Sequence, residues 1–276
     1  MSGTARRRLR RNLPTDQAAR LLTDGEIELE GRLRDASNTT LRAFVTLDNV
    51  SARCVYKPIS GERPLWDFPD GTLAGREVAA YEVSRAIGWD LVPPTVMRDG
   101  PLGLGACQIW VDEVTDEVAQ RVGFVRADSL PDGWLTIAAA QDDDGEAYLL
   151  AHADDPVLAR MALFDAVVNN ADRKGGHVLP DRNGALWGID HGVCFHVEAK
   201  LRTVLWGWIG RPVPDSDLAA LVDLRRDLAE ALGQRLCQLL AAEEIDATMA
   251  RVDRLVAAGV FPAPRPGWPA VPWPPV

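Results

Sequence analysis

Two aspartates in polar turns, Asp172 and Asp190, constrain this chain more than any other feature of its sequence. They lie in the stretch 163–195, which reads LFDAVVNNADRKGGHVLPDRNGALWGIDHGVCF. The first follows an apolar run, and the second ends a short strand after a predicted hairpin. Carboxylates presented in this way suit metal-assisted chemistry on phosphates. The rest of the chain is therefore expected to bring a phosphate compound to this stretch.

Composition sets the class of protein in which these aspartates lie. With 276 residues, 47% of them hydrophobic, the chain can bury the core of one large domain or of two lobes. Its formal net charge of −10 argues against general nucleic-acid binding, which needs a basic surface. No apolar run approaches the roughly 20 residues that span a bilayer, so we expect no integral membrane association. Four widely spaced cysteines without a CxxC pair are typical of reduced core residues, and we expect a cytoplasmic protein.

Two N-terminal segments, 25–34 and 41–47, alternate polar and apolar residues in the manner of β-strands. The turn that joins them is a predicted hairpin tip, rich in small polar side chains. Its hydroxyls and backbone N–H groups could bind a phosphate, although a plain surface hairpin explains the same residues. The tip residues that we interpret as nucleotide-binding are Ser37, Asn38, Thr39 and Thr40.

A lysine on the next strand and a glutamate on the following helix form a second candidate pair. The segment 52–58 is a predicted strand that carries Lys57, and 72–87 is a predicted amphipathic helix that carries Glu77. An ion pair between a strand lysine and a helix glutamate holds the lysine over nucleotide phosphates in kinases. Glu82, further along the helix, is a competing partner.

The segment 105–111 is a predicted buried strand that ends in a candidate hinge between two lobes. At such a hinge, backbone groups can bond a purine while an aromatic or aliphatic side chain covers its face. Gln108 and Trp110 are therefore candidate nucleotide-binding residues. A core strand that ends in a packed tryptophan is the alternative.

The remaining segments are expected to surround the two aspartates. The acidic stretch 115–155 is interpreted as an irregular, solvated insertion, because its DDDGE run lacks the ligand spacing of a calcium loop. Apolar residues at helical spacing predict helices over 156–169, 215–240 and 243–258. The arginine-rich start is expected to be a flexible arm, or else an arm that contacts phosphate or an acidic surface. The proline-rich end is expected to lie extended over a lobe.

The chain contains four motifs in a recognisable order: VYKP, GREVAAYEV, NNADRKGG and GIDHGVCF. In these motifs it resembles actinobacterial proteins of a phosphatidylinositol 3/4-kinase-like family. That family consists of atypical kinases related to the HipA-type toxin kinases. The resemblance covers roughly residues 25 to 240 and implies an α+β, protein-kinase-like fold with two lobes. The N-lobe, an antiparallel sheet plus a helix, would span 25–112, and a mainly helical C-lobe would span 113–261. An arm with a short helix (1–24) would precede them, and a proline-rich tail (262–276) would follow.

The resemblance also implies roles for individual residues. Lys57 would contact the phosphates of ATP, and Glu77, rather than Glu82, would orient it. Asp172 would accept the proton of a substrate hydroxyl, and Asp190 would bind Mg²⁺ or Mn²⁺.

The sequence departs from the kinase pattern at two places. The position five residues after the catalytic aspartate holds an asparagine in the related kinases and His177 here, which could ligate a metal or mark an altered activity. Asn170, two residues before Asp172, could supply an amide nearby and is a further candidate catalytic residue. The hairpin tip contains no glycine, so a phosphate clamp there would depend on its hydroxyls.

The predicted function is an ATP-dependent phosphotransferase that acts on a hydroxyl of a small molecule or a protein. A pseudokinase that binds a partner through the tryptophan-rich residues 205–210 or through the tail is one alternative, and a kinase-fold enzyme that transfers AMP is another. The sequence leaves open both the substrate, because a fold does not determine it, and the oligomeric state.

Overall fold

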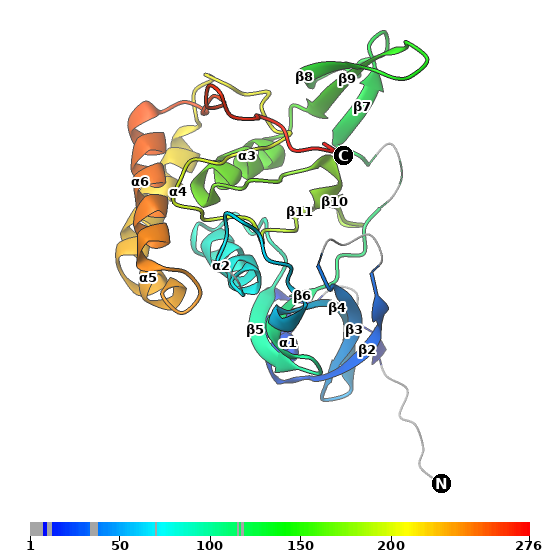
Figure 1. The fold of residues 1–276 in the computed structure, drawn as a ribbon, viewed down its shortest axis with the longest axis vertical. Helices are drawn as coiled ribbons and strands as arrows, with labels where there is room; N and C mark the ends of the chain where they lie inside the picture. The colour runs from blue at the N-terminus through cyan, green and yellow to red at the C-terminus, as the bar shows by residue number, and fades with distance from the viewer. Residues whose placement is uncertain (1–7, 10–12, 34–37, 70, 115, 117–118) are drawn as a thin grey trace.

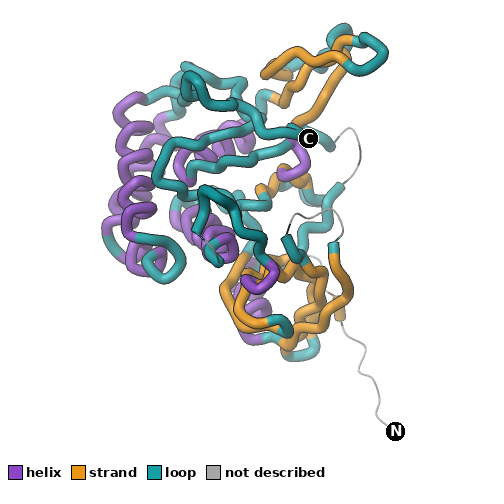
Figure 2. The backbone as a smooth tube through the Cα atoms, in the orientation of Figure 1, coloured by secondary structure: helices purple, strands orange, loops and turns teal. Residues whose placement is uncertain are grey.

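The computed structural model describes residues 8–9, 13–33, 38–69, 71–114, 116 and 119–276. Figure 1 shows a strongly curved sheet formed by the N-terminal strands and a larger, mostly helical part that contains the C-terminal half. Helix α2 (Leu73–Ala86) lies between them. Figure 2 shows that long loop segments cross the helical part, as expected for a chain with many turn residues. Within the described residues, no helix is long and apolar enough to cross a membrane.

The N-terminal sheet follows the predicted alternation of polar and apolar residues. Its main strands, in spatial order, are β2 (Glu26–Arg32), β3 (Leu41–Leu47), β4 (Val50–Pro58), β6 (Gly103–Ile109) and β5 (Thr95–Gly100), each antiparallel to its neighbour. Strands β3 and β4 join through Asp48 and Asn49, whose positive φ angles of 48° and 63° suit a two-residue hairpin turn. Helix α1 (Thr15–Asp24) buries Leu21 and Leu22 against the apolar face of the sheet.

The arginine-rich arm falls largely outside the described residues. Of it, the two-residue strand β1 (Arg8–Leu9) pairs in parallel with the start of β4. This pairing places part of the arm at the sheet.

Helix α2 is buried on nearly all sides, because it packs against both parts of the molecule. The fully buried Arg76 donates from Nη2 to Glu244 Oε1 (2.5 Å) and from Nη1 to the carbonyl of Cys194 (2.6 Å). Glu244 belongs to α6 (Ala242–Ala258), and Cys194 follows Asp190 in the chain. Helix α2 is thereby held by the helical part as well as by the sheet.

The helical part packs around α3 (Pro156–Val168), which is buried along most of its length. Asp155 caps its first turn by accepting from the N–H of Val157 at 2.7 Å, and Asn169 ends it in a left-handed conformation with φ 54°. The helix predicted over 215–240 breaks at Glu230 into α4 (Asp215–Ala229) and α5 (Ala231–Leu236). After α3, the short helix η2 (Gly175–His177) leads into the predicted hairpin of β10 (Val178–Pro180) and β11 (Leu186–Gly188).

The prediction of an irregular insertion over 115–155 was wrong. Most of this stretch forms an antiparallel sheet in the order β7 (Val122–Arg126), β9 (Ala147–Ala153) and β8 (Trp134–Gln141). The acidic run is the turn between β8 and β9, where the carboxylate of Asp142 accepts from the N–H groups of Asp144 (3.1 Å) and Glu146 (2.8 Å). The acidic residues are therefore those of a local turn, whereas the residues on either side of the turn form strands.

The proline-rich residues 262–276 lie extended across the helical part, where Figure 1 draws them in red. The carbonyl of Ala270 accepts from Trp206 Nε1 (2.8 Å) and from the N–H of Thr203 (3.1 Å). Near its end, the carbonyl of Pro275 accepts from the N–H of Gly175 (2.8 Å). The C-terminal segment therefore touches the turn that carries Asp172.

Candidate active site

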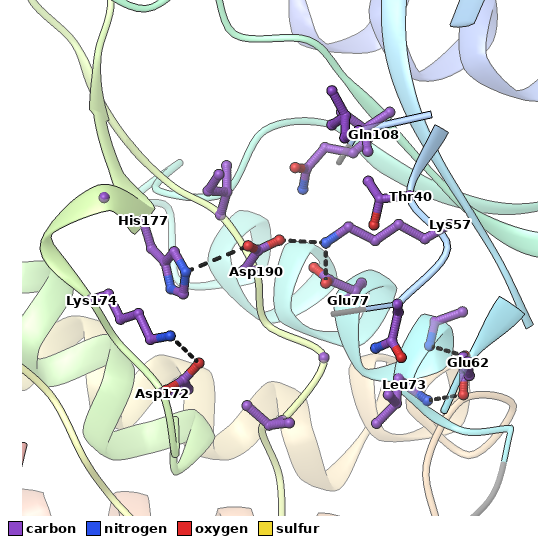
Figure 3. Close-up of a pocket in the computed structure, with 18 of the residues that line it drawn as sticks. Thr40, Lys57, Glu62, Leu73, Glu77, Gln108, Asp172, Lys174, His177 and Asp190 are labelled. Atoms are coloured by element: carbon purple, nitrogen blue, oxygen red, sulfur yellow. Dashed lines mark hydrogen bonds and ion pairs between the residues drawn. The ribbon is translucent and has the colours of Figure 1, made fainter. Parts of the chain in front are cut away.

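A cleft of about 1220 Å³ opens between the N-terminal sheet and the helical part. Its walls come from β4, α2, the end of β6, the 171–177 turn and the residues around Asp190. Ten of the lining residues are labelled in Figure 3. The cleft brings together residues that are more than 130 positions apart in the sequence.

Lys57 lies between two carboxylates (Figure 3), at 2.5 Å from Glu77 Oε1 and 2.6 Å from Asp190 Oδ1. The second oxygen of Glu77 accepts from the N–H of His191 at 3.0 Å, so the glutamate also holds the segment that carries Asp190. Glu82, the competing partner, instead pairs with Arg235 at 3.0 Å. The strand lysine and the helix glutamate thus form the ion pair that the kinase resemblance implies.

The charges of this triad are firmly fixed. Burial lowers the pKa of Lys57, but the negative charges of Asp190 and Glu77 outweigh that effect and raise it overall. The positive charge of Lys57 holds the pKa of Asp190 well below its usual range. Lys57 and Asp190 are therefore both ionised at neutral pH, so a cation and a carboxylate anion are held together in the cleft.

Asp190 also has an unusual backbone. Its φ of 60° lies in the left-handed region, which is uncommon for residues other than glycine. Its side chain remains about half exposed to the cleft. Strained backbone of this kind recurs at functional sites, where neighbouring contacts hold it in place.

Asp172 lies on the opposite side of the cleft from Lys57 in Figure 3. Its Oδ2 is 3.5 Å from Lys174 Nζ, and its backbone N–H donates to Asn170 Oδ1 at 2.9 Å. Burial raises the pKa of Asp172, and the positive charges of Lys174 and Arg202 oppose that rise. A partly buried carboxylate with a raised pKa has the properties of a general base. Lys174, which the sequence analysis missed, adds a cation beside it.

Asn170 is a candidate catalytic residue on sequence grounds, and the structure places its amide within the turn that carries Asp172 rather than in the cleft. Asn170 is fully buried, does not line the cleft, and donates from Nδ2 to Asp165 Oδ1 at 3.0 Å while its Oδ1 accepts from Asp172. Both amide atoms are therefore occupied in shaping the turn. Asn170 is a positioning residue for Asp172.

A buried arginine connects the turn of Asp172 with the segment of Asp190. Arg173 is fully buried and pairs with Asp165 at 2.9 Å. It also donates to the carbonyls of Ile189 (3.0 Å) and His177 (3.2 Å) and lies 2.7 Å from Nε2 of His191. Sequence reasoning missed this network, although an aspartate inside the apolar run 163–168 was a signal that a buried cation must pair with it.

His177 and Asp190 fit a divalent cation. His177 Nε2 is 3.5 Å from Asp190 Oδ2, the carboxylate oxygen that Lys57 does not bind. Burial lowers the pKa of His177 to about 4, so the ring is neutral and keeps a lone pair at neutral pH. Nδ1 is buried without a partner among the described residues, so no contact of that atom fixes the tautomer. An imidazole and a carboxylate suit Mn²⁺ well, and nucleotide phosphates and water can complete the shell of Mn²⁺ or Mg²⁺.

In the part of the chain that the structure describes, no group of three His, Cys, Asp or Glu side chains forms a preformed metal cage. Kinase-like sites do not need one, because the nucleotide itself supplies ligands. The residues that would hold the ion are therefore Asp190 and His177.

The hairpin tip reaches the cleft only in part. Ser37 lies outside the described residues, whereas Asn38, Thr39 and Thr40 line the cleft. The N–H of Thr39 donates to the carbonyl of Gly61 (3.0 Å), and Asn38 Oδ1 accepts from the N–H of Arg63 (2.8 Å). These contacts join the tip to the loop after β4, and among the described residues the hydroxyls of Thr39 and Thr40 have no hydrogen-bond partner.

The hinge residues also line the cleft, but two of their polar groups are already bonded. Gln108 is buried and donates from Nε2 to Thr95 Oγ1 at 2.8 Å, and the N–H of Trp110 donates to the carbonyl of Arg53 at 3.0 Å. These groups are not available to a purine. The side chains of Trp110, Val55 and Leu33 remain as apolar surfaces at this end of the cleft.

Comparisons with known proteins place the chain among relatives. No family profile matches it. It is 48% identical over 266 residues to Protein Rv2133c of Mycobacterium tuberculosis (strain ATCC 25618 / H37Rv), and the match covers 94% of this chain and 95% of that protein. The chain belongs to the Rv2133c family.

One solved structure shows the fold of this Rv2133c-family chain, and a second matches with a lower TM-score. The structure of hydra Fam20 with sugar matches with a TM-score of 0.50 and 14% identity, over 87% of this chain and 86% of that one. The Helicobacter pylori proinflammatory kinase CtkA matches with a TM-score of 0.45 and 12% identity, over 87% and 94% of the two chains. The predicted fold is confirmed: the Rv2133c-family chain has an α+β, kinase-like fold with two lobes.

Proposed function

We propose that the protein is an ATP-dependent phosphotransferase that transfers a phosphoryl group to a hydroxyl of a small molecule or a protein. One observation carries the proposal: Lys57 lies between Glu77 and Asp190, with Asp172 across the same cleft. This is the set of charges that kinase-like sites use to position and neutralise a nucleotide. The kinase-like fold supports it.

In this proposal each residue has a distinct role. Lys57 binds the nucleotide phosphates and Glu77 holds it in place, while Trp110 and the threonines Thr39 and Thr40 contact the nucleotide from the hinge and the hairpin tip. Asp190 and His177 would hold a divalent cation, which would supply neutralisation of the phosphate charge. The motif resemblance to phosphatidylinositol 3/4-kinase-like proteins belongs to the proposal, as does a cytoplasmic location.

The transfer step is an in-line displacement. The substrate oxygen forms a bond to the terminal phosphorus of ATP as the bond between that phosphorus and the bridging oxygen breaks. The hydroxyl proton passes to the carboxylate of Asp172, and ADP leaves with the electron pair of the broken bond. Lys174, beside Asp172, stabilises the negative charge of the transferring group.

Ligand-dependent thermal unfolding tests the site. ATP with Mn²⁺ should raise the unfolding temperature of the wild type, because a ligand that binds only the folded state stabilises it. The same addition should have no effect on Asp190→Ala, whereas Asp223→Ala on the exposed face of α4 should respond like the wild type. Equal responses of wild type and Asp190→Ala would contradict the assignment of Asp190 to the site. Mass spectrometry of the product separates the two reactions: a mass increase equal to AMP would show nucleotidyl transfer instead of phosphoryl transfer.

A further inference from the structure

The cleft has room for a second ligand beside the nucleotide. Its volume of about 1220 Å³ exceeds the ~300–1,000 Å³ that is usual for one small-molecule site. The wall beyond Asp172 is formed by residues that the proposed nucleotide site does not use. We call it the acceptor wall, and it comprises Trp66, Asp67, Lys200, Arg202 and Trp268.

Side chains of the acceptor wall are held in place by an ion pair and by cation–π contacts. Lys200, only 3% exposed, pairs with Asp67 at 2.7 Å, and its ammonium lies 4.8 Å from the ring centre of Trp66 and 5.7 Å from that of Trp268. Trp268 comes from the C-terminal segment and also donates from Nε1 to the carbonyl of Lys200 (3.3 Å). The C-terminal segment thus closes one side of the wall.

Arg202 is the cation of this wall that forms no direct ion pair among the described residues, although the carboxylate of Asp172 is close enough to feel its charge. It is partly buried, and its Nε donates to the carbonyl of Ala171 at 2.6 Å. Among the described residues, no acceptor pairs with its two terminal nitrogens. Because Ala171 directly precedes Asp172, this contact fixes the guanidinium beside the proposed base. A guanidinium held at one edge presents its remaining N–H groups as a fork that matches a phosphate or a carboxylate.

Arg202 is anchored next to Asp172 rather than to the Lys57 triad. Its Nε contact is with the carbonyl of Ala171, and its charge lowers the pKa of Asp172. In the proposed function Lys57 and Lys174 are the cations assigned to the phosphates, which leaves Arg202 for the molecule that carries the hydroxyl. In a chain of net charge −10, an unpaired cation at this point favours an anionic ligand.

We propose that the acceptor wall binds an anionic small-molecule alcohol, with Arg202 holding its phosphate or carboxylate group while a hydroxyl of the same molecule faces Asp172. This inference rests on the proposed phosphotransferase function and narrows its substrate class. A small molecule fits better than a folded protein, because Arg202 is partly buried within the cleft and Lys200 beside it is almost fully buried. The exposed indole of Trp66, 90% accessible at the rim, offers a surface to cover the bound molecule.

Three matched six-carbon probes test this class. Sorbitol is neutral, gluconate carries a carboxylate, and sorbitol 6-phosphate carries a phosphate. Calorimetric titration of the full chain at low salt, with and without Mn²⁺ and a non-hydrolysable ATP analogue, should show binding of at least one anionic probe and none of sorbitol. Comparison of the two anions identifies which group Arg202 prefers.

Arg202→Gln should weaken binding of the anionic probe by about tenfold or more, since it removes charge-assisted hydrogen bonds. Arg254→Gln, an exposed arginine of α6 outside the cleft, is the matched control and should bind like the wild type. Arg202→Gln should keep the fold of the turn, because its backbone hydrogen bonds do not use the side chain. These bonds run from the N–H of residue 202 to the carbonyl of Asn170 and from the N–H of Arg173 to the carbonyl of residue 202. The unfolding temperature of Arg202→Gln checks this.

Several results would overturn the inference. Sorbitol could bind as tightly as the anions, or Arg202→Gln could bind them like the wild type. If Arg202→Gln no longer bound the ATP analogue, Arg202 would belong to the nucleotide site instead. Binding of a glutamate-rich peptide, and of no polyol, in a manner that depends on Arg202 would replace the small molecule by a protein. If the wild type binds the anion but not the ATP analogue, the phosphotransferase proposal fails while the anion site stands.

Discussion

The carboxylate of Asp172 is subject to two opposing influences. Burial raises its pKa, whereas the nearby charges of Lys174 and Arg202 lower it, and burial prevails. The same surroundings that make it a better proton acceptor also place cations where a negatively charged phosphoryl group would pass. A single residue thus links the local electrostatics to the proposed transfer step.

Asp172→Asn should lower the rate of Mn²⁺-dependent ATP hydrolysis, with water as the acceptor, by about 100-fold or more, because an amide cannot accept the proton. Affinity for ATP should change little, since the role proposed for Asp172 is at the substrate hydroxyl rather than at the nucleotide. A single-turnover assay with labelled ATP measures the rate, and Asp223→Asn on the exposed face of α4 serves as the control. A variant that keeps the wild-type rate would remove Asp172 from the mechanism.

In the proposed site, His177 is expected to influence which divalent metal binds. His177→Asn replaces an imidazole with the amide oxygen found at this position in related kinases, so affinity for Mn²⁺ should fall by about tenfold relative to Mg²⁺. Titration of each metal in the presence of the ATP analogue measures the ratio. His196→Asn, which alters a histidine outside the cleft, should leave the ratio unchanged. An unchanged ratio in His177→Asn would show that the imidazole does not contact the ion.

At the scale of elements, α2 determines whether Lys57 and Glu77 can meet. Gly75 lies one residue before Arg76, and a Cβ at this position would come within 2.8 Å of the carbonyl oxygen of Leu239. The close approach of α2 to the helical part therefore needs a residue without a side chain. This close packing at Gly75 and the buried Arg76–Glu244 ion pair together fix the position of Glu77 in the cleft.

Gly75→Ala reverses the usual effect of alanine in a helix. An alanine inside a helix normally stabilises by about 0.5–1 kcal/mol relative to glycine. Here the contact with backbone should instead destabilise by about 1–3 kcal/mol and weaken binding of ATP with Mn²⁺, because α2 must shift. Gly31→Ala on β2 is the control, since nothing lies within 4 Å of its added Cβ and Gly31 does not line the cleft. Urea unfolding and titration of the ATP analogue measure both effects, and a stabilised Gly75→Ala would contradict this account of the packing.

Local patterns explain which elements the sequence predicts and which it does not. Alternation predicts β3 and β4, because each has one buried face, and it places Lys57 on β4. The same alternation predicts β2, although that strand is exposed along most of its length. The acidic residues of 141–146 favour an irregular loop, so the sequence does not predict the strands β8 and β9 on either side of them. The partners of Arg76 and Arg173 also could not be predicted, because a buried ion pair depends on segments that meet only in three dimensions.

At the scale of the whole molecule, three of the four histidines lie in surroundings that keep them neutral. Burial lowers the pKa of His152, of His177 and of His191. In the unfolded chain each would bind a proton below about pH 6.5. The unfolded state therefore binds more protons than the folded state in mildly acidic solution, and stability must fall as the pH decreases.

For His177 the window is defined, since its pKa is about 4 in the folded protein. Its contribution is fully present above about pH 6.5 and is lost progressively down to about pH 4, for a total of about 3 kcal/mol. His177→Asn removes this titration, so between pH 7 and pH 4.5 the variant should lose about 2–3 kcal/mol less of its unfolding free energy than the wild type. Urea unfolding at both pH values measures the difference, and an unchanged dependence on urea shows that the same transition is compared. Equal losses would mean that the ring of His177 is protonated in the folded protein, and then it could not present a lone pair to a metal.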